Sequence, residues 1–157
     1  MKRSRRALYV AVLGLLSAIL AGCSSPQDLT LTIPSNPAFE PAVLSVRAGQ
    51  QLRLTIKNDG KNNTDKHNFV LVRGGEDVMR DVTSAVTAAI NQVGSASDYL
   101  PIKERDLAKI LVHIKGIDPG KSETITFDAP PAGTYMFMCT YGRHWSYGMV
   151  GTLTVEP

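Results

Sequence analysis

Apolar and polar residues alternate along much of the chain, and a period of two is typical of β-strands with one buried side. Leu52, Leu54 and Ile56 lie on one side of such a strand, and Ile125 and Phe127 lie on one side of another. Turn-forming residues separate the alternating stretches, which fall at residues 29–33, 43–47, 52–56, 67–72, 109–115, 123–127, 134–139 and 149–155. Seven or eight short strands joined by turns favour an all-β domain, built as an antiparallel sandwich or barrel.

Between residues 74 and 110 the alternation gives way to apolar residues spaced three or four apart, which predicts a helix. The residues of this stripe are Val78, Val82, Ala85, Ala89 and Ile90. Glu76 and Asp77 suit the beginning of a helix electrostatically, and Gly94 suits its end. We therefore expect a helical insertion at about residues 75–108 that packs its stripe against the β domain. An amphipathic helix that binds a partner is the alternative.

The first residues have the pattern of an export signal, because four basic residues precede an apolar run over residues 7–20. The run is shorter than the roughly 20 apolar residues that a membrane-spanning helix needs. The sequence Leu20-Ala21-Gly22-Cys23 resembles the lipobox of bacterial lipoproteins, in which the cysteine is acylated. We predict a signal peptide at residues 1–22, a lipid on Cys23, a short linker at 23–28 and one domain at 29–157. An ordinary signal peptide that is cleaved nearby is the alternative.

Composition and charge exclude several classes of function. The 157 residues suit one domain, so an enzyme of two domains is not expected. The net charge is +3, from 17 basic and 14 acidic residues. Lys2, Arg3, Arg5 and Arg6 lie in the predicted signal peptide, which leaves 13 basic residues against 14 acidic ones. The domain is therefore nearly neutral, and no nucleic-acid partner is expected.

The candidate chemistry lies in the last quarter of the chain. Cys139, His144 and Met149 follow one another at intervals of five around a predicted loop, and His67 opens an earlier strand. A thiolate, two imidazoles and a thioether are the ligand set of a trigonal copper site with a weak axial methionine. Zinc is disfavoured because a thioether is a poor ligand for it, and a Cys-His hydrolase is disfavoured because Cys139 ends a strand. We expect the remaining methionines to pack in the core and His113 not to be a ligand.

Several stretches together resemble the cupredoxins, the small blue copper proteins of the azurin and auracyanin kind. They are residues 67–72, 135–140, the loop to His144 and Met149, and residues 151–155. The resemblance implies an eight-stranded Greek-key β-barrel or sandwich with a helical flap. It also implies that His67, Cys139, His144 and Met149 bind one copper ion that cycles between Cu(II) and Cu(I), and that the protein is no enzyme.

The resemblance extends to residues around the implied ligands. In the family an asparagine after the first histidine ties to the loop after the cysteine, and Asn68 and Thr140 stand in these places. A carbonyl before the first histidine lies near the metal in azurin, where the residue is glycine; here it is Lys66. Gly142-Arg143 replaces the usual Pro-Gly pair and is expected to put a cation beside His144. Aromatic residues of the same loop are expected to form an apolar collar around His144; they are Tyr141, Trp145 and Tyr147.

The expected function is one-electron transfer by a copper lipoprotein, monomeric and anchored to the outer face of a bacterial membrane on its periplasmic or extracellular side. The expected partners are redox proteins: a membrane electron-transfer complex and a cytochrome or reaction centre. A copper-delivery or copper-storage lipoprotein that uses the same ligands without shuttling electrons is the alternative. The loop fits one mononuclear site better than the Met-rich or His-rich tracts expected of copper carriers, which favours electron transfer.

Overall fold

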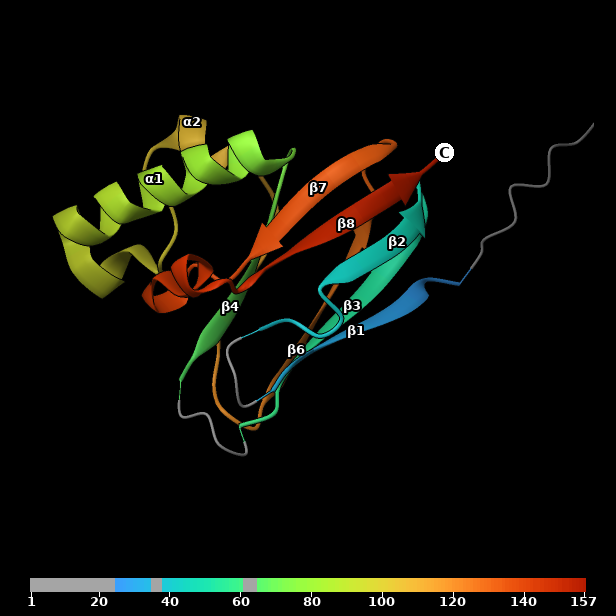
Figure 1. The fold of residues 1–157 in the computed structure, drawn as a ribbon, viewed down its shortest axis with the longest axis horizontal. Coiled ribbons are helices and arrows are strands. Elements are labelled where there is room, and N and C mark those ends of the chain that lie inside the picture. The colour runs from blue at the N-terminus through green and yellow to red at the C-terminus, as the bar shows by residue number, and fades with distance from the viewer. Residues whose placement is uncertain (1–24, 35–37, 61–64) are drawn as a thin grey trace, which may run out of the picture.

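The structure, a computed structural model, describes residues 25–34, 38–60 and 65–157. These residues form eight strands in two sheets that face one another, with helices over one end (Figure 1). The strands are β1 (Gln27–Ile33), β2 (Val43–Arg47), β3 (Gln51–Asn58), β4 (His67–Val72), β5 (Ile110–Ile117), β6 (Ser122–Asp128), β7 (Gly133–Met138) and β8 (Val150–Glu156). The prediction of a Greek-key β-sandwich with a helical insertion is confirmed.

One sheet has the strand order β1-β3-β6 and the other has the order β2-β8-β7-β4-β5. The pairs β1–β3 and β2–β8 are parallel, so the expectation of an antiparallel arrangement is wrong for these two pairs. The alternation of apolar residues reports which side of a strand is buried and says nothing about the direction of its neighbour. Parallel pairs arise here because β1 and β2 follow one another in sequence but belong to different sheets.

The core lies between the inner faces of the two sheets. On β3, Leu52, Leu54 and Ile56 are buried as predicted. The rings of Phe39, Phe69 and Phe137 meet one another, with centroid separations between 5.3 and 6.0 Å. Gly151 allows β8 to pass this cluster, because a Cβ at this position would lie 2.2 Å from Cζ of Phe137.

The helix α1 (Glu76–Val93) covers the outer face of β4, and this makes β4 a strand that is buried on both sides. Phe69 and Leu71 face the main core, while Val70 and Val72 pack in a second cluster with Val82 and Val86 of α1. Val86 is missing from the predicted stripe, and Ala85 of that stripe is only partly buried. The helix ends at Gly94, which has a positive φ of 61°.

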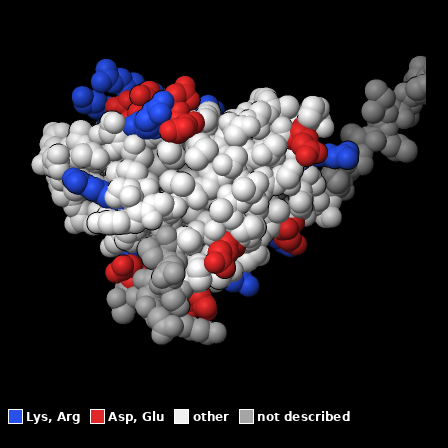
Figure 2. Space-filling view, in the orientation of Figure 1, with Lys and Arg blue, Asp and Glu red and all other residues white. Residues whose placement is uncertain are grey.

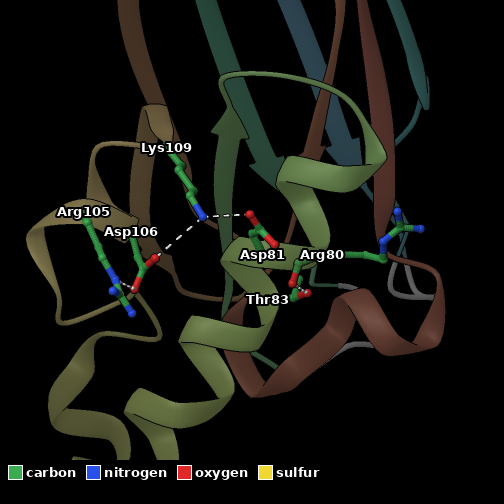
Figure 3. Close-up of polar contacts among 6 residues, drawn as sticks. All are labelled: Arg80, Asp81, Thr83, Arg105, Asp106 and Lys109. Carbon is green, nitrogen blue, oxygen red and sulfur yellow. Dashed lines mark hydrogen bonds and ion pairs between the residues drawn. The ribbon is translucent and has the colours of Figure 1, made fainter.

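The rest of the insertion returns the chain to the sheet through η1 (Gly94–Ser97) and the short helix α2 (Glu104–Leu107). Neither element was predicted. Lys109, just before β5, ties the insertion together, because its Nζ lies 2.8 Å from Asp81 on α1 and 3.7 Å from Asp106 on α2 (Figure 3). None of the helices in the described part of the chain is long and apolar enough to span a bilayer.

The beginning of β1 and the loop that joins β7 to β8 lie at opposite ends of the molecule (Figure 1). That loop contains η2 (Tyr141–Tyr147) and approaches the C-terminal end of α1. The predicted signal peptide at residues 1–22 and the predicted lipid site at Cys23 lie outside the described residues.

Candidate metal centre

Three of the four predicted ligands bring their donor atoms together at the η2 end of the molecule. Sγ of Cys139 lies 3.7 Å from Nδ1 of His67 and 3.5 Å from Nδ1 of His144, and the two nitrogens are 3.0 Å apart. His67 and Cys139 are fully buried, and His144 is partly exposed. Among the described residues, this is the one group of histidine, cysteine and acidic side chains whose donor atoms converge in this way.

Strand pairing explains why residues so far apart in sequence meet here. The antiparallel partners of β4 and β7 include Val70 with Met138, so the beginning of β4 lies beside the end of β7. His67 is the first residue of β4, and Cys139 directly follows the last residue of β7. The antiparallel register of these strands thus places the imidazole and the thiol at the same end of the sheet.

The loop after Cys139 turns back on itself and closes on Met149. The amide of Cys139 donates to the carbonyl of Met149 at 3.1 Å, and the amide of Met149 donates to the carbonyl of His144 at 3.2 Å. Gly142 has a φ of 54°, and a Cβ there would lie 3.0 Å from Nε2 of His144. Met149 is fully buried in the main core cluster, directly beside Cys139 in the β7–β8 ladder.

Asn68 fastens the beginning of this loop to β4, as the sequence predicts. Its Oδ1 accepts hydrogen bonds from the amides of Thr140 at 2.7 Å and Tyr141 at 3.1 Å, and its Nδ2 donates to Oγ1 of Thr140 at 2.9 Å. The backbone amide of Asn68 points at Sγ of Cys139, 3.3 Å away, a contact that was not predicted. These bonds do not involve a metal, so they hold the loop in shape without one.

Burial governs the protonation of the three converging groups. Loss of hydration raises the pKa of the Cys139 thiol to about 12, because the thiolate is costly in a buried site. Burial lowers the pKa of His67 to about 4, with a further contribution from the neighbouring His144, and it also lowers the pKa of His144. Near neutral pH both imidazoles are therefore neutral and have lone pairs available for a metal.

Two charged residues beside the histidine ligands, Arg143 and Lys66, direct their side chains away from the site. Arg143 does not put its cation beside the His144 ring, because its guanidinium extends to α1 and donates from Nη2 to Oδ1 of Asn91 at 3.1 Å. Lys66 directs its side chain away to an ion pair with Asp118, with Nζ and Oδ1 2.9 Å apart. The role of Lys66 as a residue beside the ligands, directly before His67, stays a prediction.

The expected aromatic collar around His144 forms only in part. Tyr147 is exposed, at 77% of its surface, but Tyr141 packs against the main core and against the ring of Tyr99. Trp145 packs on the cluster between α1 and β4. The aromatic pattern of a loop does not reveal these attachments, because Tyr99 and α1 come from a distant part of the sequence. As expected, Met136 and Met138 pack with that cluster, and His113 is exposed on β5.

The donor set fits copper. Two neutral imidazole nitrogens and a thiol sulfur surround one buried point, and the next polar group that faces the sulfur is the Asn68 amide. Soft sulfur with imidazole selects copper, whereas a site for magnesium or calcium needs several carboxylate or carbonyl oxygens. The geometry leaves room for a single ion, because the donor atoms all lie within 4.8 Å of one another.

Comparisons with known proteins agree with this chemistry. Residues 30–156 match the model of a family described as copper binding proteins, plastocyanin/azurin family. Auracyanin-A of Chloroflexus aurantiacus is 31% identical, with 99% of this chain and 100% of that protein covered. Auracyanin-B of the same organism is 38% identical over 79% of this chain, which spans about half (49%) of its length.

A solved structure supports the same conclusion about the fold. The structure of dithionite-reduced auracyanin from the photosynthetic bacterium Roseiflexus castenholzii superposes with a TM-score of 0.70 at 36% identity. It covers 85% of this chain and 100% of that chain. The match over nearly the whole domain and the converging histidine and cysteine donors show that the protein binds one copper ion. The chain belongs to the plastocyanin/azurin family of copper-binding proteins, the cupredoxins.

Proposed function

We propose that the protein is a membrane-tethered one-electron carrier whose copper is held by His67, Cys139, His144 and Met149. The observation that carries the proposal is the convergence of one thiol and two neutral imidazoles in a preformed, buried site. When bound there, copper supplies a single electron by cycling between Cu(II) and Cu(I). The family's electron carriers use such a site.

The chain's own residues suit this task because they restrict movement. Cys139 leaves β7 directly, His67 opens β4, and both are fully buried. Asn68 holds the loop that follows Cys139 through bonds that need no metal. Donor atoms that stay in place in both oxidation states require little rearrangement when an electron moves. The thioether of Met149, buried beside Cys139, would complete the set as the fourth ligand.

The proposed electron port is the edge of His144, the only one of the four ligands that is partly exposed. Figure 2 shows that the viewed face over β7 and β8 carries few charged side chains, which gather over the helices and at the margins. Tyr147 adds an exposed apolar ring near His144 in the same loop. A face with few charges beside the ligand loop favours brief contacts with redox partners. The proposed partners are a membrane electron-transfer complex and a cytochrome or reaction centre.

The tether is proposed from the sequence, and the beginning of β1 fixes where it would join the domain. A lipid on Cys23 would lie four residues before Gln27, where β1 begins. Four residues of extended chain reach about 13 Å at 3.3 Å per residue. Because the beginning of β1 and the ligand loop lie at opposite ends, the copper end would point away from the membrane (Figure 1). The proposed location is the outer face of a bacterial membrane, on the periplasmic or extracellular side.

The first test is the visible and EPR spectrum of the domain from Ser24 onward after addition of one equivalent of Cu(II). We expect an intense thiolate-to-copper band and a narrow copper hyperfine splitting, bleached by a mild reductant and restored by an oxidant. Cys139→Ser removes the thiolate and should abolish the band, and His113→Gln, at an exposed histidine, should keep it. A band that persists in Cys139→Ser would contradict the ligand assignment.

The same experiment separates electron transfer from the alternative function. Copper held only as Cu(I), with no coloured oxidised form, would contradict the electron carrier and favour a copper-delivery or copper-storage lipoprotein. Rapid electron self-exchange between oxidised and reduced copper protein would favour the carrier, because a storage site has no need of it.

A further inference from the structure

We propose that the helical insertion is a positioning device for His144, and that Asn91 and Tyr99 are its positioning residues. The insertion is the segment from α1 to α2, and the ligand loop is the segment between Cys139 and Met149. Neither residue touches the metal ligands directly, and each contacts a loop residue near His144. The inference deepens the proposed function, because it names what keeps the electron port in place.

Three contacts attach the ligand loop to the insertion, and they flank His144 in sequence. Arg143, just before His144, donates from Nη2 to Oδ1 of Asn91 on α1 at 3.1 Å. Trp145, just after it, packs on the cluster that contains Val82 and Val86. The ligand loop lies beside the far end of α1, as Figure 1 shows.

The third contact is a pair of aromatic rings. Tyr99 and Tyr141 have centroids 4.3 Å apart with an angle of 41° between their planes, and the Tyr141 ring lies 6.3 Å from the His144 ring. Tyr141 also donates its amide to Asn68, so this ring is held from β4 and from the insertion together. The residues directly before and after His144, Arg143 and Trp145, therefore both contact the insertion.

The backbone supports a specific role for these contacts. In the part of the chain that the structure describes, three residues other than glycine have a positive φ: Asp98 at 52°, Tyr99 at 57° and Arg143 at 63°. Tyr99 and Arg143 each make one of the contacts, and Asp98 precedes Tyr99. Residues with a Cβ adopt this conformation at a cost, and it persists where the surrounding structure requires it. The costly conformations thus coincide with the attachment of the ligand loop.

The insertion can serve as a fixed support because it is held independently of the ligand loop. Val82 and Val86 are fully buried against β4, and Lys109 joins α1 to α2 through Asp81 and Asp106 (Figure 3). Asn91 is exposed, so its bond to Arg143 contributes little to global stability. Removal of this bond should therefore release the ligand loop without unfolding the domain.

The test compares Asn91→Ala, Tyr99→Ala and the double variant with the unaltered domain. In the copper-free protein we expect amide hydrogen exchange within residues 141–147 to become about 3- to 10-fold faster in each single variant. In the copper protein we expect a changed EPR hyperfine splitting and electron self-exchange that is slower by about threefold or more. The double variant should show the larger effect.

Conservative variants and a matched control make the test specific. Asn91→Asp keeps an acceptor for Arg143 and Tyr99→Phe keeps the ring, so both should restore the behaviour of the unaltered domain. Arg80→Ala breaks an exposed ion pair with Glu76 within α1, which neither joins the insertion to another element nor reaches the ligand loop, and it should leave the EPR spectrum unchanged.

Two results would be read separately. The wild-type protein could show the thiolate band and electron self-exchange. If Asn91→Ala, Tyr99→Ala and the double variant then have the same EPR spectrum and the same amide hydrogen exchange in the loop as the wild type, the positioning role alone would be overturned. A wild-type protein without the thiolate band would contradict the proposed function, and loop exchange in the copper-free variants would still decide whether the insertion holds the loop.

Discussion

Asn68 is the residue on which the shape of the site depends most strongly. Its side chain satisfies a buried amide, a partly buried amide and a buried hydroxyl of the loop after Cys139. A buried amide without a partner costs about 1–3 kcal/mol. We expect Asn68→Ala to lower the free energy of unfolding of the copper-free protein by about 3 kcal/mol, measured by chemical denaturation.

Thr140→Val is the matched control for this prediction. It removes the hydroxyl that Asn68 Nδ2 meets but leaves both amide bonds to Oδ1 intact, so its expected cost is about 1 kcal/mol. Equal losses in the two variants would contradict the view that the amide bonds dominate.

His67 makes the copper-free protein sensitive to acid. Its pKa is about 4 in the folded protein, because of burial and the nearby His144, against an ordinary 6.5. In acid the unfolded chain takes up a proton near pH 6.5, whereas the folded protein resists until about pH 4. Stability should therefore fall as pH falls between these values, by up to about 3 kcal/mol. Denaturation of the copper-free protein at a series of pH values measures this.

The control exploits the exposed histidine of β5. His67→Gln should reduce the pH dependence between 6.5 and 4 and leave the smaller part that comes from the lowered pKa of His144, while His113→Gln should leave it as it is. If both variants keep the slope of the unaltered protein, another group causes it.

At the scale of elements, α1 matters because it buries the second face of β4. Val86 is fully buried against this strand, and its truncation removes two carbons from a packed cluster. We expect Val86→Ala to lower the free energy of unfolding by about 2 kcal/mol. Val93 belongs to the same helix and is 42% exposed, so Val93→Ala should change it by less than about 0.5 kcal/mol. A thermal or chemical denaturation series distinguishes the two.

The elements also show which features of the fold the sequence predicts and which it does not. Strand and helix positions follow from periodicity, because burial of one face imposes a period of two on β3 and a period of 3.6 on α1. The direction of β1 and β2 relative to their neighbours is absent from that pattern. The six buried residues of β4 likewise require a helix from another part of the chain.

Some contacts of the site could likewise be predicted from the sequence, and others could not. The convergence of His67, Cys139 and His144 could be expected, because chemistry and a family resemblance identify these residues. The bonds from Asn68 to Thr140 could be expected for the same reason. The contact between Arg143 and Asn91 could not, since 52 residues separate them and Asn91 belongs to no motif. Long-range contacts between exposed side chains leave no periodic or local signal in a sequence.

At the scale of the whole molecule, the beginning of β1 and the ligand loop lie at opposite ends (Figure 1), which leads to a prediction about the proposed tether. Insertion of a flexible ten-residue segment between Cys23 and Gln27 would raise the average reach of the linker from about 10–12 Å to about 19–22 Å. If the short linker sets the height of the port above the membrane, electron transfer to a membrane-bound partner should change in rate. The absorption and EPR spectra should stay the same, because the added segment precedes β1, which begins at the end of the molecule opposite the ligand loop (Figure 1).

The measurement is stopped-flow oxidation of the lipidated protein in membranes, compared with the same reaction of the unlipidated domain in solution. A geometric role predicts that the inserted segment alters the rate in membranes and leaves the rate in solution as it was. Unchanged rates in both settings would mean that the tether only concentrates the protein at the membrane surface. In that case the separation of the two ends would reflect the topology of the fold, in which the loop between β7 and β8 and the beginning of β1 lie at opposite ends for packing reasons alone.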